Sequence, residues 1–278
     1  MSTQAEKAER FLALHRGPTP LLLPNAWDKG SAKIFAELGF EAMATTSGGH
    51  AATLGRLDGR VTRDEALVHA ADIVSATDLP VSADFENAFA DAPADIAANV
   101  TLAVATGLAG CSVEDFARSV DDPIYESALA AERVAAAAEA AHRGPAHVVL
   151  TARAENYLHG RPDLADTIAR LQRYQEAGAD VLYAPGLSDA GDLRTLVASV
   201  DRPVNVLALP NAPTVAELGE IGVGRVSIGS TFAAVGLGAV VTAARELLDS
   251  GTYGFFAVAA QGRATARAAF ADRTSTMG

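Results

Sequence analysis

Leu79-Pro-Val-Ser-Ala-Asp-Phe-Glu86 is an apolar run that ends in two acidic residues, and Leu108-Ala-Gly-Cys-Ser-Val-Glu-Asp115 repeats the design further along the chain. Short apolar runs bounded by turn residues are typical of buried parallel strands. Asp84 and Glu86 stand two residues apart, so in an extended strand their side chains share a face. The two runs therefore predict neighbouring parallel strands that end in carboxylates.

Similar apolar runs alternate with longer Ala-rich segments through most of the chain. Strands are expected at 21–25, 41–46, 79–84, 108–114, 147–153, 180–184, 203–207 and 225–228. Helices are expected between them at 29–38, 64–76, 94–106, 127–142, 163–177, 189–198 and 214–220. Eight βα units without a break in composition favour a single TIM-type (β/α)8 barrel over residues 1–278. An open doubly wound sheet is the alternative, but no Gly-x-Gly-x-x-Gly follows the first strand.

Two more helices are expected after the eighth strand, at 233–249 and 255–271. A barrel needs only one closing helix, so residues 250–278 are predicted to be a C-terminal helical extension. This extension docks either on its own barrel or on a neighbouring subunit.

Composition limits the classes of partner. The chain has 278 residues and a formal net charge of −12, without a Lys/Arg run, which argues against nucleic acid and anionic membranes. The single Cys111 excludes an internal disulfide and is expected in the core. The N-terminal residues 1–10 lack the apolar core of a signal peptide, and no run of 18 apolar residues occurs. A cytoplasmic protein is predicted.

Four acidic residues lie near the carboxyl ends of the second to fourth expected strands: Asp58, Asp84, Glu86 and Glu114. One such residue is usually a turn or a helix cap. Four of them gathered at the reactive end of a barrel repel one another unless a cation lies between them. Oxygen ligands suit Mg²⁺ or Mn²⁺, so a metal site is predicted.

Other residues suggest an anion site beside these carboxylates. Thr45-Thr-Ser-Gly-Gly-His50 offers consecutive backbone N–H groups, although a plain Gly-rich turn has the same composition. His50 is either a base or a packing residue. Arg153 closes an apolar strand and binds either a ligand anion or a neighbouring acid such as Glu155 or Glu114. Asn205, inside another apolar strand, needs a ligand oxygen or a backbone carbonyl as its partner.

Several motifs together resemble the isocitrate lyase/phosphoenolpyruvate mutase superfamily. They are Pro24-Asn-Ala-Trp-Asp28, Ser47-Gly-Gly49, Asp58, Asp84-Phe-Glu86, Val113-Glu-Asp115, Ala152-Arg153, Leu207-Ala-Leu-Pro-Asn-Ala-Pro-Thr-Val-Ala-Glu-Leu218 and Gly224-Arg-Val-Ser-Ile-Gly229. The resemblance spans roughly residues 10–250 in consistent order. It implies a Mg²⁺-dependent barrel that forms dimers or tetramers, often by exchange of a C-terminal helix.

The resemblance also implies roles for individual residues. Asp84 would bind Mg²⁺ directly, while Asp58, Glu86 and Glu114 would hold its waters. Ser47, Gly48 and Gly49 would cradle a substrate carboxylate or phosphonate, Arg153 would grip another anionic oxygen, and Asn205 is the further substrate-binding candidate. The catalytic candidates are Asp58, Glu114 and Arg153.

The region after the fourth strand departs from the family pattern. The lyases carry Lys-Lys-Cys-Gly-His there and the phosphonomutases carry a Lys and an Asn, whereas this chain reads Phe116-Ala-Arg-Ser-Val-Asp-Asp-Pro-Ile-Tyr125. Pro185 is followed by Gly186, where the lyases have Glu. Residues 116–126 are predicted to be a mobile lid without a catalytic acid, apart from an exposed carboxylate or Tyr125.

The sequence therefore predicts a Mg²⁺-dependent lyase or decarboxylase that acts on a small 2-oxo or 2-hydroxy dicarboxylate through a metal-stabilised enolate. Two alternatives stay open. One is P–C mutase or hydrolase chemistry on a phosphonopyruvate-like substrate, and the other is a non-catalytic 2-oxo-acid binding protein.

Overall fold

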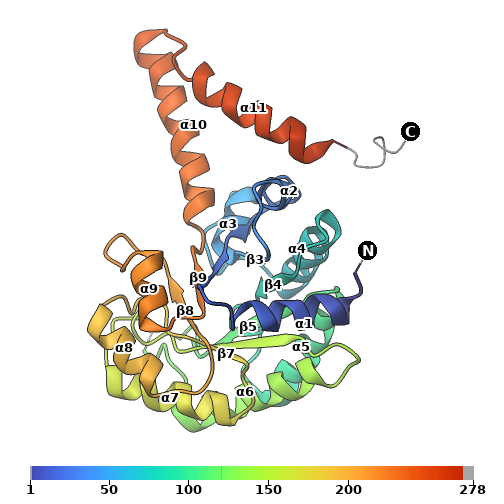
Figure 1. Ribbon diagram of the computed structural model, residues 1–278, viewed down its shortest axis with the longest axis vertical. Helices are drawn as coiled ribbons and strands as arrows, with labels where there is room; N and C mark the ends of the chain where they lie inside the picture. Colours follow the sequence, from blue (N-terminus) through green and yellow to red (C-terminus); the bar gives the residue numbers. More distant parts are fainter. Residues whose placement is uncertain (1, 120, 272–278) are drawn as a thin grey trace.

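The structure is a computed structural model that describes residues 2–119 and 121–271. Helices and strands alternate along most of the chain (Figure 1). The elements are α1 (Gln4–Leu14), β1 (Leu21–Leu23), β2 (Asn25–Ala26), α2 (Lys29–Glu37), β3 (Met43–Thr45), α3 (Ser47–Thr53), α4 (Arg63–Ala76), β4 (Val81–Asp84), α5 (Pro93–Ala105), β5 (Gly110–Glu114), α6 (Ser127–His142), β6 (Val149–Arg153), α7 (Leu164–Glu176), β7 (Val181–Tyr183), α8 (Ala190–Ala198), β8 (Val204–Leu207), α9 (Val215–Ile221), β9 (Arg225–Ser227), α10 (Thr231–Ser250) and α11 (Phe256–Phe270).

The strands form one parallel sheet in the order β1-β9-β8-β7-β6-β5-β4-β3-β2. Only Pro24 separates β1 from β2, because proline has no N–H to donate to a ladder. β1 pairs with β9, and β2 pairs with β3. The two short strands therefore act as one barrel strand interrupted at Pro24, and this strand joins the two edges of the sheet. The predicted barrel is confirmed, and the open doubly wound sheet is excluded.

Helix α1, which the sequence reasoning did not predict, covers the amino ends of the strands. A capping box between Thr3 and Glu6 starts it, and its Phe11 side chain is fully buried. A Cβ on Gly110 would lie 2.7 Å from Cε1 of Phe11, so only glycine lets β5 pass beneath this ring. Phe11 packs with Leu21, Leu23, Val149 and Val181 in a small apolar cluster at this end of the barrel.

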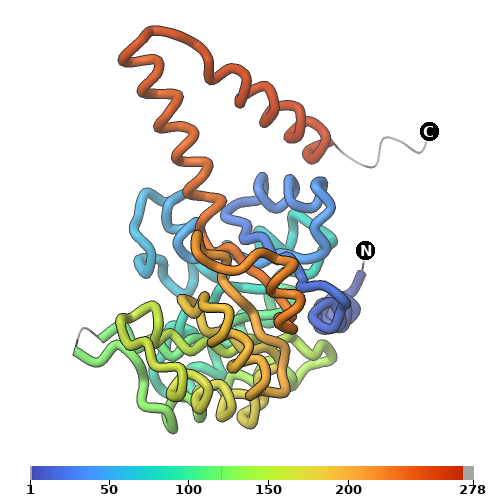
Figure 2. The backbone as a smooth tube through the Cα atoms, turned by 60° about the vertical axis from the view of Figure 1, so that its left-hand side comes forward, coloured from blue at the N-terminus to red at the C-terminus, as the bar shows by residue number. Residues whose placement is uncertain are grey.

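Helices α10 and α11 are the two expected C-terminal helices. Figure 1 shows α10 rising away from the barrel and α11 running back, and Figure 2 shows the same arrangement from another side. The end of α11 lies beside α2, where Phe270 Cζ is 3.5 Å from the position of a Cβ on Gly30. Among the described residues, α10 is the one helix long and apolar enough to cross a membrane by length and composition. Residues 272–278 of the expected extension lie outside the described residues.

Candidate active site

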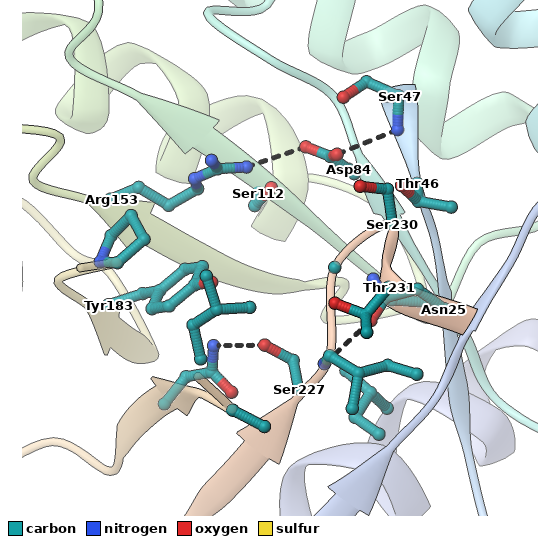
Figure 3. A pocket seen from close by; sticks show the side chains of 18 of the residues that line it. Asn25, Thr46, Ser47, Asp84, Ser112, Arg153, Tyr183, Ser227, Ser230 and Thr231 are labelled. Atoms are coloured by element: carbon teal, nitrogen blue, oxygen red, sulfur yellow. Dashed lines mark hydrogen bonds and ion pairs between the residues drawn. The ribbon is translucent and has the colours of Figure 1, made fainter. Parts of the chain in front are cut away.

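A cavity of about 250 Å³ opens at the carboxyl ends of the strands (Figure 3). Strand register explains which side chains reach it, because Asp84 of β4 pairs with Ser112 of β5, and Glu114 pairs with Arg153 of β6. Its polar lining includes Asp58, Asp84, Arg153, Asn205, Arg225 and Ser227. This is the end of the barrel at which the sequence placed the reactive residues.

Arg153 is the centre of the charged part of the site. Its Nη1 lies 2.7 Å from Oδ1 of Asp84, its Nε donates to Oε1 of Glu155 at 2.8 Å, and its Nη2 lies 3.2 Å from Oε2 of Glu114. Figure 3 shows Asp84 between Arg153 and the backbone N–H of Ser47, which donates to Oδ2 at 3.0 Å. The structural pairing with Glu114 and Glu155, one of the two interpretations of Arg153, is thus present.

Three carboxylates surround one guanidinium, so the charges of this cluster balance only when protons or a further cation neutralise part of the carboxylates. Burial raises the pKa of Glu114 well above its usual value; Arg153 opposes the shift, while Glu155 and Asp84 add to it. Burial alone would lower the pKa of Arg153, but the same carboxylates raise it well above its usual value. An additional cation would relieve this repulsion, and carboxylate oxygens are the donors that Mg²⁺ prefers.

Glu86 does not share a strand face with Asp84, so that expectation is wrong. Strand β4 ends at Asp84, and Glu86 has a φ of 50°, which breaks the alternation of an extended strand. Its buried carboxylate pairs with Arg118 of the segment after β5 and does not line the cavity. Glu114 is also buried behind the lining and reaches the site through Arg153.

Ser47, Gly48 and Gly49 form the first turn of helix α3, not an open Gly-rich loop. Thr46 caps this helix and accepts a hydrogen bond from the Gly49 N–H at 3.2 Å, while the Ser47 N–H is held by Asp84. Two of the three amides expected to form an anion nest are therefore already bonded within the protein. A Cβ on Gly48 would lie 3.1 Å from Oδ2 of Asp58, so this glycine lets the exposed Asp58 approach.

His50 lies in the last turn of α3 and packs against a ring of helix α4. Its imidazole stacks on that of His69, with 3.9 Å between centroids. His50 does not line the cavity, which matches the interpretation of this residue as a packing residue.

A polar network at the floor of the cavity was not expected from the sequence. Arg225, only 3% exposed, donates from Nε to Oδ1 of Asn205 at 2.9 Å and from Nη2 to Oγ1 of Thr151 at 3.1 Å. Nη1 lies 3.2 Å from Nε2 of His15, whose Nδ1 is 2.7 Å from the carbonyl of Phe11. Burial lowers the pKa of Arg225 to about 10, so it stays charged at neutral pH.

Asn205 lines the cavity and has side-chain partners in its floor. Its Nδ2 donates to Oγ of Ser227 at 2.9 Å, as Figure 3 shows. The guanidinium of Arg225 contacts three uncharged groups, namely the side chains of Asn205 and Thr151 and the neutral ring of His15. A buried cation without a paired carboxylate is costly, so the floor of the cavity favours an anion.

The described part of 116–126 folds into a small turn beside the site. Phe116 and Ile124 form an antiparallel bridge, and the Ala117 N–H donates to the carbonyl of Pro123 at 2.7 Å. The hydroxyl of Tyr125 pairs with Asp91, and Tyr125 does not line the cavity. Val120 lies outside the described residues.

Comparison with known proteins identifies the family. The sequence model of phosphoenolpyruvate phosphomutase matches residues 11–248. The chain belongs to this family. The resemblance seen in the sequence motifs is therefore confirmed, and the barrel found here is the fold of the superfamily.

Individual relatives agree with this assignment. A Burkholderia cenocepacia structure, provisionally described as a lyase/mutase, is 47% identical with a TM-score of 0.93 and covers 96% of this chain and 97% of its own. An uncharacterised protein of Mycobacterium tuberculosis is 37% identical over 86% of this chain and 89% of its own. A 2-methylisocitrate lyase of Halalkalibacterium halodurans is 26% identical over 73% of this chain and 67% of its own. Two of these three names describe a lyase or mutase, and one of the two names a small carboxylate, 2-methylisocitrate.

Proposed function

We propose that this protein is a Mg²⁺-dependent carbon–carbon lyase or decarboxylase that acts on a small 2-oxo or 2-hydroxy dicarboxylate. The observation that carries the proposal is the ring of Asp84, Glu114 and Glu155 around Arg153 beside the cavity. When all three are ionised, these carboxylates exceed the charge of one guanidinium. A divalent cation next to Asp84 would neutralise the remaining negative charge of these carboxylates.

Asp84 would hold the metal directly, and Asp58, which lines the same cavity, would hold one of its water ligands. Glu86 and Glu114 would hold further waters only after release from Arg118 and Arg153, their present partners. When bound, Mg²⁺ supplies an electrophile for a developing enolate oxygen. Arg153 keeps Asp84 oriented through the 2.7 Å contact, and the Ser47 N–H fixes the second oxygen of the same carboxylate. The half-buried position of both side chains limits the access of bulk water, which strengthens charge interactions there.

The floor of the cavity supports a dianionic substrate. Arg225 places a positive charge below Asn205 and Ser227, and its hydrogen-bonding partners carry no negative charge. One carboxylate of the substrate would meet the metal, and the other would lie towards this charge. Decarboxylation or C–C cleavage that leaves an enolate needs no strong acid in the cleavage step, which suits a lid without Cys, Lys or His.

Turnover tests this proposal. Oxaloacetate, 2-methylisocitrate and dimethylmalate would be assayed with Mg²⁺, with EDTA, and with the Asp84→Asn variant. We expect Mg²⁺-dependent release of a 2-oxo acid from at least one of them, and loss of that activity in EDTA and in Asp84→Asn. Full activity in EDTA would refute the metal. No turnover of any of these three acids would refute the substrate class.

Phosphonate chemistry is the second candidate, and the family description favours it. It predicts that phosphonopyruvate is converted in a phosphorus NMR time course while the dicarboxylates are not. A catalytically silent binding protein is the third possibility. It predicts calorimetric binding of a 2-oxo acid with no turnover in either assay.

We also propose that a second copy of this chain covers α10. The helix leaves the barrel with Val235, Leu237, Val240 and Leu248 exposed at 55–82%. Exposed apolar area of this kind is typical of an interface between subunits. Light scattering should give a dimer or tetramer, and Val240→Glu should shift it towards monomer. A monomeric wild type, or one that binds vesicles through α10, would refute this partner.

A further inference from the structure

A second group of ligating side chains lies at the opposite end of the barrel. His142 ends α6, His147 precedes β6, and Asp180 precedes β7. The catalytic cavity lies at the other ends of these strands, about 13 Å away along a strand of five residues. The predicted oxygen-ligand site around Asp84 and this group are therefore separate.

Both imidazoles are aimed at one carboxylate. His142 Nε2 lies 2.9 Å from Oδ2 of Asp180, and His147 Nε2 lies 2.9 Å from Oδ1. The three ligating atoms all lie within 4.8 Å of one another. The Leu150 N–H donates to Oδ2 at 2.9 Å and fixes the orientation of the carboxylate, as outer partners do in metal sites.

The charges of this group favour a cation. The two rings stack with 3.8 Å between centroids and 11° between planes, so two protonated imidazoles there would repel each other. Asp180 is buried, and His142, His147 and the Leu150 N–H are its hydrogen-bonding partners. Asp180 is the one acidic side chain of this group, and its carboxylate lies between the two rings' Nε2 atoms.

From this geometry we propose that His142, His147 and Asp180 form a binding site for a transition-metal cation of the Zn²⁺ class. Two imidazole nitrogens and one carboxylate oxygen suit Zn²⁺ and its neighbours, whereas Mg²⁺ prefers oxygen alone. Water would complete the coordination. The site is empty here.

Little movement is needed to admit the ion. Ligand atoms around a tetrahedral Zn²⁺ with bonds of about 2.05 Å are about 3.3 Å apart, compared with 2.9 Å between each Nε2 and its Asp180 oxygen. The rings must also turn, and each Nε2 must give up the proton it shares with Asp180, so that the two lone pairs converge on the ion. The His147 side chain, which is 49% exposed, has room to turn.

The bound ion would link three segments of the chain directly. It would tie the end of α6 to the starts of β6 and β7, at the face of the barrel that serves stability and not catalysis. We therefore assign the site a structural role, in which Zn²⁺ raises the melting temperature and does not enter the reaction.

Calorimetric titration with Zn²⁺ in excess Mg²⁺ tests the site, because Mg²⁺ then occupies the carboxylates of the catalytic cavity. We expect one Zn²⁺ per wild-type chain, binding weakened by at least about tenfold in His142→Gln and in His147→Gln, and unchanged binding in His50→Gln and Asp84→Asn. Circular dichroism without metal checks that each variant is folded. Co²⁺ absorption in the visible range would show imidazole ligation.

Two results would overturn the proposal. One is a wild type that binds no Zn²⁺ in tenfold excess over protein. The other is equal Zn²⁺ affinity in wild type, His142→Gln and His147→Gln. Loss of binding in Asp84→Asn alone would place the ion in the catalytic cavity, so failure of this site is distinguishable from failure of the proposed function.

Discussion

Replacing Arg153 with lysine keeps the positive charge in the cavity but removes the three-way contact. The guanidinium reaches Asp84, Glu114 and Glu155 with three different nitrogens, at 2.7, 3.2 and 2.8 Å. One ammonium group cannot span all three carboxylates, so at least two contacts are lost. Charge-assisted hydrogen bonds contribute about 1.5–3 kcal/mol each, and the losses are not additive. We expect Arg153→Lys to be destabilised by about 3–5 kcal/mol, as for other broken buried ion pairs.

The assay is thermal unfolding with and without Mg²⁺. A loss of 1 kcal/mol lowers the melting temperature of a domain of about this size by roughly 2–4 °C, so the melting temperature should fall by roughly 6–20 °C. Mg²⁺ should restore more stability to the variant than to the wild type, because the released carboxylates gain most from a bound cation. Arg56→Lys is the matched control: Arg56 contacts Glu65 at 2.9 Å on the surface, and the change should cost less than about 1 kcal/mol.

Two outcomes would refute this reasoning. A melting temperature within about 2 °C of wild type would show that the contacts of Arg153 contribute little. A large fall that Mg²⁺ does not reduce would show that these carboxylates do not attract a divalent cation. The Michaelis constant is a second measurement. If Arg153 contacts the substrate, its replacement with lysine should raise KM even at temperatures at which the variant is fully folded.

Four further changes test other parts of the site. Asp84→Asn should abolish Mg²⁺-dependent turnover in the dicarboxylate assay, and full activity would contradict the role of Asp84. Arg225→Met should raise KM for a dicarboxylate by roughly tenfold, which corresponds to about 1.4 kcal/mol of binding free energy. KM for a monocarboxylate should rise much less. Equal effects on both would argue against an attraction between the Arg225 charge and a second carboxylate. Burial lowers the pKa of His15 to about 3, so the folded protein resists its protonation and wild-type stability falls as pH drops below about 6.5. His15→Gln should remove about 2 kcal/mol of that loss at pH 5, measured by urea unfolding. Tyr125→Phe should leave kcat nearly unchanged, because the hydroxyl pairs with Asp91 outside the cavity, and a thousandfold fall would make it the acid.

The sequence predicted the barrel because each strand is a buried run between amphipathic helices, and such patterns are local. It missed two helices for local reasons as well. Residues 1–10 look like a polar tail, although Thr3 and Glu6 are the signal of a capping box. The glycines of α3 oppose helix formation, although Thr46 is a good N-cap.

The site was predicted in part. Asp84, Glu114 and Arg153 end strands β4, β5 and β6, and strand ends meet in a parallel barrel, so the sequence could bring these three together. Glu86 was assigned the wrong face because side-chain alternation holds only within a strand, and β4 ends at Asp84. The left-handed φ of Glu86 has no signal in its residue type.

The two features that the sequence could not predict depend on contacts between distant parts of the chain. Arg225 meets His15 across 210 positions, and Asp180 meets His142 across 38. Neither arginine at the start of a strand nor histidine after a helix carries a pattern of its own. Burial determines the partners that these residues need. Water solvates a charge at the surface, whereas a charge inside the barrel needs a partner of opposite sign or a hydrogen-bonding group. Arg225 therefore points to an anion at the reactive end, while His142, His147 and Asp180 point to a cation at the other.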